Sequence, residues 1–273
     1  MTAEPRALDA AALRAALDTE DTAARPWRRL DIVEVTGSTN ADLIARSRDG
    51  DDIAGAVLLA EHQTAGRGRG GRSWAGVRHG QIIMSVGIAT DGVDEQRWGL
   101  VPLLAGVAVV DTLSASGIDA GLKWPNDVLI GTAKIAGILA EVASPKPVIV
   151  LGIGLNVAVR PEEIGQPQAT SVYQLGVEAD RTDIVRTLLA RLGERIGQWR
   201  TGDTDALLDD YRARSATLGA RVRAQLPGGR DIVGTAEAID GQGRLRIGTE
   251  SGSEVVSAAD IVHLRPAGDG AVE

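Results

Sequence analysis

The pattern of hydrophobic and polar positions predicts a mixed α/β domain that extends to about residue 215. Apolar residues three and four apart mark helices, whereas short and mostly apolar runs mark buried strands. The expected helices are 8–17, 41–50, 97–117, 183–200 and 204–216. The expected strands are 31–36, 56–61, 81–89, 121–130, 134–143 and 148–157.

The pattern changes near residue 220, where short alternating segments are separated by glycine-rich turns. Such segments are typical of a small antiparallel β-barrel. We therefore expect a first domain over 1–217, a barrel over 218–268 and a tail over 269–273.

Two connections before the barrel have distinct compositions. Gly131 and Thr132 are expected to turn the chain back as a β-hairpin between two strands. Residues 158–170 contain two prolines and show no periodicity, so we expect a mobile loop there.

The composition of the 273 residues suits a cytoplasmic protein with one large and one small domain. The chain has no cysteine, which excludes disulfides and thiolate chemistry and fits a reducing compartment. Its three histidines, His62, His79 and His263, lack the spacing of zinc ligands. There is no signal-peptide pattern, and no apolar run reaches the roughly 18 residues of a membrane span.

The charge and the length before the first strand argue against nucleic-acid binding. The net charge of −8 disfavours general association with a polyanion. About 25 residues precede the first strand. We expect these to be too few for a DNA-reading domain of roughly 50 residues or more.

Lysine and asparagine are rare, and their positions are informative. The chain has three residues of each type, and arginine serves as its common cation. Lys123, Asn126 and Lys134 lie together in the segment GLKWPNDVLIGTAKIAG, while Asn40 and Asn156 lie in GSTN and GIGLN. Asparagine also favours turns for backbone reasons, so a structural explanation stays open.

The segment GRGRGGR, residues 66–72, combines three arginines with four glycines. Glycines allow backbone N–H groups to converge on an anion, and arginine forks match phosphate and carboxylate oxygens. The segment therefore predicts a site for an anionic ligand such as ATP. A solvated loop is one alternative. A dinucleotide fingerprint is another, although the following residues form a poor helix.

The KWPND motif places Lys123 and the Asn126–Asp127 pair on either side of a bend fixed by Pro125. A lysine suits a phosphate or carboxylate, and the two following side chains offer oxygens for Mg²⁺. The alternative is a surface ion pair beside a core tryptophan. Lys134, on the next strand, could face the same cleft or solvent. GSTN could simply cap a helix, and GIGLN could allow close packing.

Taken in order, the motifs GSTN, AEHQTAGRGRGGRSW, LKWPND, KIAGIL and GIGLN resemble those of the biotin protein ligases, over residues 30–157. The resemblance implies an α+β fold, with a mixed sheet and helices like a class II synthetase, followed by a small SH3-like β-barrel. It implies an enzyme that uses ATP and Mg²⁺ to make biotinyl-5′-AMP. The biotin is then moved to one lysine of a biotin carboxyl carrier protein.

The resemblance also implies roles for individual residues. Lys123, Arg67 and Arg69 are expected to be catalytic, and Asn126 and Asp127 to bind the metal. Asp127 could also accept a proton from the attacking amine. The expected biotin and nucleotide contacts are Ser38, Thr39, Asn40, Gln63, Arg67, Gly68, Arg69, Arg72, Trp74, Lys123, Asn126, Lys134, Gly152, Gly154 and Asn156. The 64–76 loop is expected to order over the ligand.

Two alternatives stay open. A lipoate-type ligase of the same superfamily would use similar chemistry, and a non-catalytic biotin-sensing or nucleic-acid-binding module could use the arginine loop. We expect ligase activity without operator binding, no association with membranes, and a monomer or weak homodimer.

Overall fold

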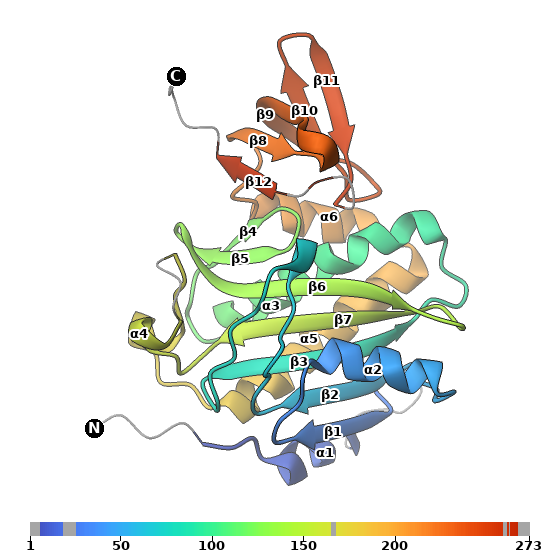
Figure 1. Cartoon of the computed structure of the whole chain (residues 1–273), viewed down its shortest axis with the longest axis vertical. Helices are drawn as coiled ribbons and strands as arrows, with labels where there is room; N and C mark the ends of the chain where they lie inside the picture. The colour runs from blue at the N-terminus through green and yellow to red at the C-terminus, as the bar shows by residue number, and fades with distance from the viewer. Residues whose placement is uncertain (1–5, 19–25, 165–167, 259–260, 262, 267–273) are drawn as a thin grey trace.

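The computed structural model describes residues 6–18, 26–164, 168–258, 261 and 263–266, and it contains two β-sheets (Figure 1). The larger sheet has the strand order β1-β2-β3-β7-β6-β5-β4. Its strands are β1 (Arg29–Val33), β2 (Ala56–Ala60), β3 (Gln81–Ala89), β4 (Gly121–Lys123), β5 (Asp127–Ile130), β6 (Ala133–Ala143) and β7 (Val148–Asn156). The β1–β2 pair is parallel and the other pairs are antiparallel, so the predicted mixed sheet is confirmed.

Helices cover both faces of this sheet, which explains the continuous apolar runs in its central strands (Figure 1). The helices are α1 (Ala10–Asp18), α2 (Thr39–Arg48), α3 (Val101–Ser114), α4 (Pro161–Ile164), α5 (Arg181–Thr201) and α6 (Thr204–Ala213). Helix α2 packs on one face with Leu43 fully buried, and α1, α3 and α5 contribute to the core on the other face.

Helix α3 is the central core helix. The predicted helix 97–117 is present as a 3-10 segment, Glu95–Leu100, followed by α3. The segment Glu95–Ser114 is long and apolar enough to cross a membrane by length and composition, but 67% of its most apolar window is buried inside the protein. The core helix of a soluble protein meets the same criteria.

The prediction of an irregular, mobile loop over residues 158–170 is partly wrong. Residues Pro161–Ile164 form a short helix, and Glu163 Oε2 accepts a hydrogen bond of 2.8 Å from Arg160 N. Lys134 N donates to Gln168 O at 2.7 Å, and Thr170 N donates to Lys134 O at 2.9 Å. The segment is therefore held by pairing with β6, which local composition does not reveal. Residues 165–167 lie outside the described part of the chain.

The C-terminal sheet has the order β11-β10-β9-β8-β12. Its strands are β8 (Arg221–Gln225), β9 (Asp231–Ile239), β10 (Leu245–Thr249), β11 (Gly252–Val256) and β12 (His263–Pro266). The expected antiparallel domain is confirmed, but as an open sheet. Within the described residues no pairing joins β11 to β12 and closes a barrel. The predicted tail, 269–273, lies outside those residues.

The C-terminal domain contacts both motif loops of the larger domain. Trp124 of KWPND is buried, and its Nε1 donates to Gly243 O at 2.9 Å. Arg69 of the arginine loop donates to the carbonyl oxygens of Ala258 and Ile261. The smaller domain thus packs against KWPND and the arginine loop, the two segments that most strongly predict a binding site.

Candidate active site

A cavity lies on the α2 side of the larger sheet, between the start of α2, the 64–76 loop and strands β6 and β7. It brings together residues from five separate motifs. Its lining residues are Ser38, Thr39, Asn40, Gln63, Arg67, Gly68, Arg69, Arg72, Ser73, Trp74, Ile83, Met84, Asn126, Lys134, Gly137, Ile138, Leu139, Gly152, Ile153 and Gly154. Thirteen of the fifteen ligand contacts expected from the sequence are in this set, and Lys123 and Asn156 are not.

Glycines form the floor of the cavity because other groups approach the sheet closely there. Gly137 and Gly154 are paired across β6 and β7, and the Trp74 ring lies over them. A Cβ at Gly154 would lie 2.5 Å from the Trp74 ring, and one at Gly152 would lie 2.4 Å from Asn40 Oδ1. A side chain at either position would therefore force the Trp74 ring or the Asn40 side chain to move. Gly137 was missed by the sequence reasoning, although it lies within KIAGIL.

One end of the cavity is polar and uncharged. Ser38 caps α2 by accepting a hydrogen bond from Ala41 N at 3.5 Å. Thr39 N donates to Gln63 Oε1 at 2.8 Å, which leaves the Gln63 amide nitrogen as a donor. Ser38, Thr39 and Gln63 are all less than one-tenth exposed. The predicted helix cap is therefore correct, and the same residues also line the cavity.

The opposite end is cationic, and the arginine loop folds back on itself there. Gly68 N donates to Arg72 O at 2.7 Å, and Arg72 Nε donates to Arg69 O at 3.0 Å. Gly70 and Gly71 have φ of 64° and 75°, which favours glycine at the tip. Burial lowers the pKa of Arg69, the charge of Arg72 lowers it further, and Asp127 acts in the opposite direction. The guanidinium therefore lies in surroundings that would favour an added anion.

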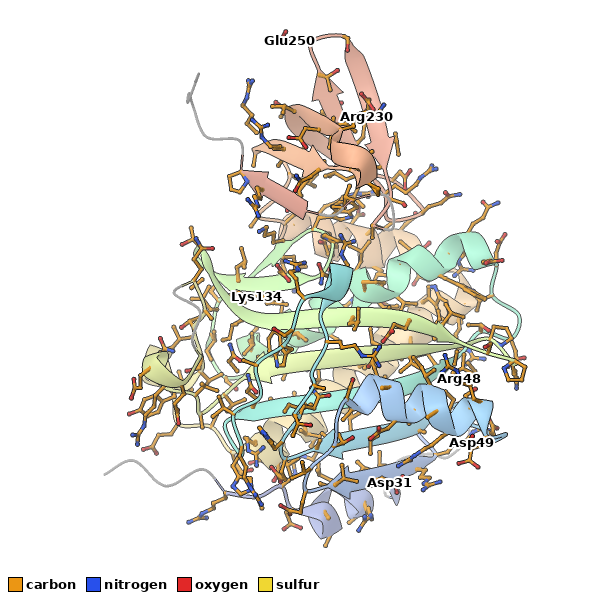
Figure 2. The ribbon with its side chains drawn as sticks, in the orientation of Figure 1. Asp31, Arg48, Asp49, Lys134, Arg230 and Glu250 are labelled. Carbon is orange, nitrogen blue, oxygen red and sulfur yellow. The ribbon has the colours of Figure 1, made fainter. Side chains whose placement is uncertain are left out.

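Lys134 is the lysine that lines the cavity (Figure 2). Its Nζ lies 2.5 Å from Asp127 Oδ1 and 5.5 Å from the centre of the Trp74 ring. A β-bulge explains its direction, because Val128 pairs with Ala136 whereas the next residue of β5 pairs with Lys134. The extra residue places the Lys134 side chain against Gly137, on the cavity face.

Lys123 and Asn156 occupy other places. Lys123 ends β4, which is the edge strand and is separated from β6 by β5. Strands are spaced by about 4.8 Å, so Lys123 starts roughly 10 Å farther along the sheet than a residue on β6. Asn156 is buried, where it accepts from Gln81 Nε2 at 2.8 Å and donates to Thr170 O at 2.9 Å. Its amide holds the ends of two loops together and does not line the cavity.

The proposed metal ligands lie side by side but do not form a complete site. Asn126 Nδ2 donates to Ile138 O at 2.8 Å, and among the described residues its Oδ1 has no hydrogen-bond donor, so this oxygen could coordinate an ion. Asp127 supplies one carboxylate beside it. Within the described residues there is no cluster of three or more His, Cys, Asp or Glu side chains that could hold a metal alone. An amide oxygen and a carboxylate suit Mg²⁺ that is held largely by substrate phosphates.

Comparisons with known proteins agree with this geometry. Residues 33–157 match the model of the biotin/lipoate A/B protein ligase family, and residues 217–264 match the biotin protein ligase C-terminal domain. The chain is 55% identical over 244 residues to the biotin–[acetyl-CoA-carboxylase] ligase of Mycobacterium tuberculosis. That match covers 88% of this chain and 90% of the relative.

The chain belongs to the biotin protein ligase family.

Solved structures show the ligase fold over most of the chain. The biotin protein ligase of Aquifex aeolicus in complex with biotin and ATP aligns with a TM-score of 0.76 at 28% identity. The alignment covers 88% of this chain and 100% of the Aquifex aeolicus chain. The Leishmania major ligase in complex with biotinyl-5-AMP aligns with a TM-score of 0.60 at 26% identity, covering 84% and 99% of the two chains. The bifunctional ligase/repressor of Bacillus subtilis is 32% identical over 76% of this chain and 66% of its own length.

The ligase contains two polar cavity neighbours that sequence reasoning missed. Ser85, on β3, is fully buried, and its Oγ lies 2.6 Å from both Thr39 Oγ1 and Asn40 Oδ1. Glu141, on β6, accepts from Asn40 Nδ2 at 2.8 Å. In the sequence, Ser85 stands out only as a polar residue inside the apolar run QIIMSVGIA. No feature of the sequence marks Glu141 as a neighbour of the cavity.

Proposed function

We propose that this ligase joins the carboxylate of biotin to the α-phosphate of ATP and then transfers biotin to a lysine of a biotin carboxyl carrier protein. The observation that supports this proposal is the uneven charge of the cavity lining. Gln63 and Thr39 offer neutral hydrogen-bonding groups, whereas Arg69 and Lys134 offer positive charge. A neutral ring system with polar edges suits the first pair. Carboxylate and phosphate groups suit the second.

The first step needs positive charge more than proton transfer. The biotin carboxylate is ionised at neutral pH, so no general base is required. A carboxylate oxygen bonds to the α-phosphorus as the bond to the leaving pyrophosphate breaks, and biotinyl-5′-AMP forms. We assign the central cation to Lys134 in place of Lys123, because Lys134 lines the cavity. Arg67 and Arg69 supply further charge, and one such group contributes about 3 kcal/mol to transition-state stabilisation.

The second step forms an amide. The neutral amine of the acceptor lysine attacks the acyl carbon, AMP leaves with the bonding electrons, and the amine loses a proton. Asp127 is the proton acceptor that the sequence suggests, but its carboxylate is paired with Lys134 at 2.5 Å. We therefore propose that Asp127 orients Lys134, while its role as a base stays a prediction.

Mg²⁺ would be held by Asn126 and Asp127 together with the phosphates of ATP. When bound, the ion would neutralise phosphate charge. The free Oδ1 of Asn126 supports this assignment. The protein's own contribution is to hold Asn126 in the cavity lining and Asp127 beside Lys134 through the KWPND bend.

Further expectations belong to the same proposal. We propose a domain division near residue 217, where the match to the C-terminal family begins. Activity without operator binding and a monomeric or weakly dimeric state stay predictions. Salt-dependent binding to duplex DNA without biotin would contradict the first, and sedimentation measurements test the second.

The deciding experiment follows pyrophosphate release from ATP and Mg²⁺ with biotin, with lipoate, or with neither. Biotin-dependent release that is lost in Arg67→Ala and Lys134→Ala is the expected result. Release with lipoate alone would assign the chain to lipoate chemistry. No release from a folded sample with either acid would leave only a binding protein.

A further inference from the structure

The arginine loop, residues 66–72, belongs to a small hairpin whose two ends are held in different ways. Trp74 N donates to Gly66 O at 2.9 Å and closes the hairpin. Before the hairpin, Thr64 N and Ala65 N each donate at 2.9 Å to carbonyl oxygens of residues 36 and 37. Backbone pairing therefore fixes the chain where it enters the loop.

The chain that leaves the loop, residues 75–77, is held by one side chain. Gln81 Nε2 donates to Ala75 O at 3.0 Å, and Gln81 Oε1 accepts from Val77 N at 3.0 Å. Within the described part of the chain, neither Ala75 nor Gly76 takes part in a backbone–backbone hydrogen bond. The Gln81 amide thus takes the place of the backbone pairing at the other end of the loop.

The orientation of the Gln81 amide follows from its partners. A carbonyl oxygen only accepts and a backbone N–H only donates, so Nε2 must face Ala75 and Oε1 must face Val77. Nε2 also donates to Asn156 Oδ1 at 2.8 Å, which uses its second hydrogen. Gln81 is 3% exposed, so water has little access to replace these hydrogen bonds.

Gln81 is itself anchored in the larger sheet. It is the first residue of β3 and pairs with Asn156, the last residue of β7. Arg181 Nη1, from α5, donates to Gln81 O at 2.8 Å, and Arg181 is also buried. The side chain therefore links residues 75–77 to β7, the strand that carries Gly154 on the floor of the cavity.

Residues 75–77 lie next to groups that line the cavity. A Cβ at Gly76 would lie 2.5 Å from Gln63 O, so the backbone passes close to Gln63 there. Arg72 and Trp74, just before this segment, both line the cavity. A displacement of residues 75–77 would therefore be passed on to charged and aromatic groups of the site.

We propose that Gln81 is a positioning residue for adenylation, which fixes the exit of the arginine loop and with it the places of the three arginines. Gln81 does not line the cavity, so it acts through the loop. Positive charge stabilises a transition state most when it is held in place before the reaction. A misplacement of about 1 Å costs roughly 100-fold in rate. This inference rests on the proposed function.

The first test is hydrogen exchange followed by mass spectrometry, which needs no ligand. Gln81→Leu removes all three hydrogen bonds of the side-chain amide and keeps a side chain of similar size. We expect exchange over residues 66–77 to become about 10-fold faster, because the loss of these bonds makes local opening easier. Exchange in α3 should not change.

The matched control is Thr90→Val, at the other end of the same strand. Thr90 directly follows β3, it is buried, and its Oγ1 donates to Pro147 O at 2.7 Å. The substitution therefore removes a buried hydrogen bond that does not involve the loop. Exchange over residues 66–77 should stay at the wild-type rate.

The second test separates kcat from substrate binding in biotin-dependent pyrophosphate release. Gln81→Leu should lower kcat about 10- to 100-fold, since misplaced charge acts on the transition state. The dissociation constant of biotin should change little, because Gln63 keeps its own backbone bridge to Thr36. Thr90→Val should keep the wild-type kcat. Thermal unfolding gives the folded fraction of each variant, and a merely structural role of Gln81 would leave kcat of the folded fraction unchanged.

Gln81→Glu separates the hydrogen-bond donors from the size of the side chain. A carboxylate still accepts from Val77 N, but it cannot donate to Ala75 O or to Asn156 Oδ1. We expect a lower kcat in this variant at about pH 8, where a carboxyl group is ordinarily ionised. It is the deciding variant if Gln81→Leu does not fold, and a wild-type kcat would contradict a role for the donors.

The outcomes separate this inference from the proposed function. Unchanged exchange over residues 66–77 or a wild-type kcat in folded Gln81→Leu would overturn the inference while biotin ligation stands. An equal loss of kcat in Thr90→Val would also overturn it, because the effect would not be local to the loop. Failure of the wild type to release pyrophosphate with biotin would instead remove the proposed function. The exchange experiment would still report whether Gln81 holds the loop.

Discussion

Lys134 Nζ lies 2.5 Å from Asp127 Oδ1, and the two residues belong to adjacent strands of one hairpin. The pair joins the KWPND bend to the cation that lines the cavity. The ammonium also lies 5.5 Å from the centre of the Trp74 ring, so three motifs meet at this point. An arriving anion would find the lysine already oriented, which reduces the cost of ordering it.

Lys134→Ala is expected to lower biotin-dependent adenylation by about 100- to 1,000-fold, as for the loss of a group that stabilises developing charge. Lys123→Ala should lower it far less, because Lys123 does not line the cavity. Pyrophosphate release under single-turnover conditions measures both effects. Lys146→Ala, at an exposed ion pair, is the control. A larger loss in Lys123→Ala than in Lys134→Ala would restore the assignment made from sequence.

Gly154→Ala is expected to weaken binding of both substrates and to destabilise the fold by about 1–3 kcal/mol, because overpacking forces neighbouring groups to move. The new Cβ would lie 2.5 Å from the Trp74 ring. Gly197 is exposed on α5, and a Cβ there would meet nothing within 4 Å. Gly197→Ala should therefore stabilise the protein by about 0.5–1 kcal/mol. Denaturant unfolding measures the free energy of unfolding of both variants. A Gly154→Ala variant that is as stable as Gly197→Ala would contradict the close approach of Trp74.

Arg181→Met is expected to destabilise the protein by about 3–5 kcal/mol, because it leaves a buried carboxylate without its partner. Arg181 Nη2 donates to Glu61 Oε2 at 2.6 Å, and both side chains are almost fully buried. The double variant Glu61→Gln with Arg181→Met should recover part of the loss. Unfolding midpoints at pH 7 provide the measurement. A double variant that is as unstable as the sum of its single changes would argue against a charge effect.

Asp31 is expected to contribute to stability at neutral pH and to lose this contribution in acid. Burial opposes ionisation of Asp31, but hydrogen bonds from Arg46 and Arg29 outweigh it and hold the pKa of the carboxyl below its usual value. The contribution is fully present above about pH 4, the ordinary pKa in an unfolded chain. It is lost as the pH falls through the lower folded-state pKa. The difference in free energy of unfolding between wild type and Asp31→Asn should therefore be larger at pH 7 than at pH 2.5. An equal difference at both pH values would contradict this role of Asp31.

Local chemistry in the sequence was sufficient for most of the site. α2 begins at GSTN because the Ser38 side chain caps the helix. The next two side chains, Thr39 and Asn40, are buried in the first turn of this helix. The four glycines of the arginine loop permit a tight turn wherever that loop lies. The hairpin at Gly131 follows from turn chemistry, and its φ of 57° agrees with that reading. Each of these features depends on residues close together in the chain.

Pairing between distant segments decided what the sequence left open. Residues 168–170 are ordered by backbone bonds to Lys134, so their irregular composition was misleading. Asn156 is held by Gln81, at the start of β3, and by Thr170, which are both distant in the chain. Glu141 and Ser85 contact Asn40 because β6, β3 and α2 converge there, and no local pattern in the sequence predicts these contacts.

The sequence by itself determined most of the order of helices and strands, the position of the candidate loops and the family of the protein. The reason is that periodicity, turn residues and short motifs are local properties of the chain. The expected strand 121–130 is two antiparallel strands, β4 and β5, because the chain turns back at KWPND. Only the tertiary structure decided which lysine lines the cavity. Lys123 lies on the edge strand, and a bulge opposite Val128 turns Lys134 onto the cavity face. Strand order and register depend on long-range pairing, and a shift of one residue reverses the direction of a side chain.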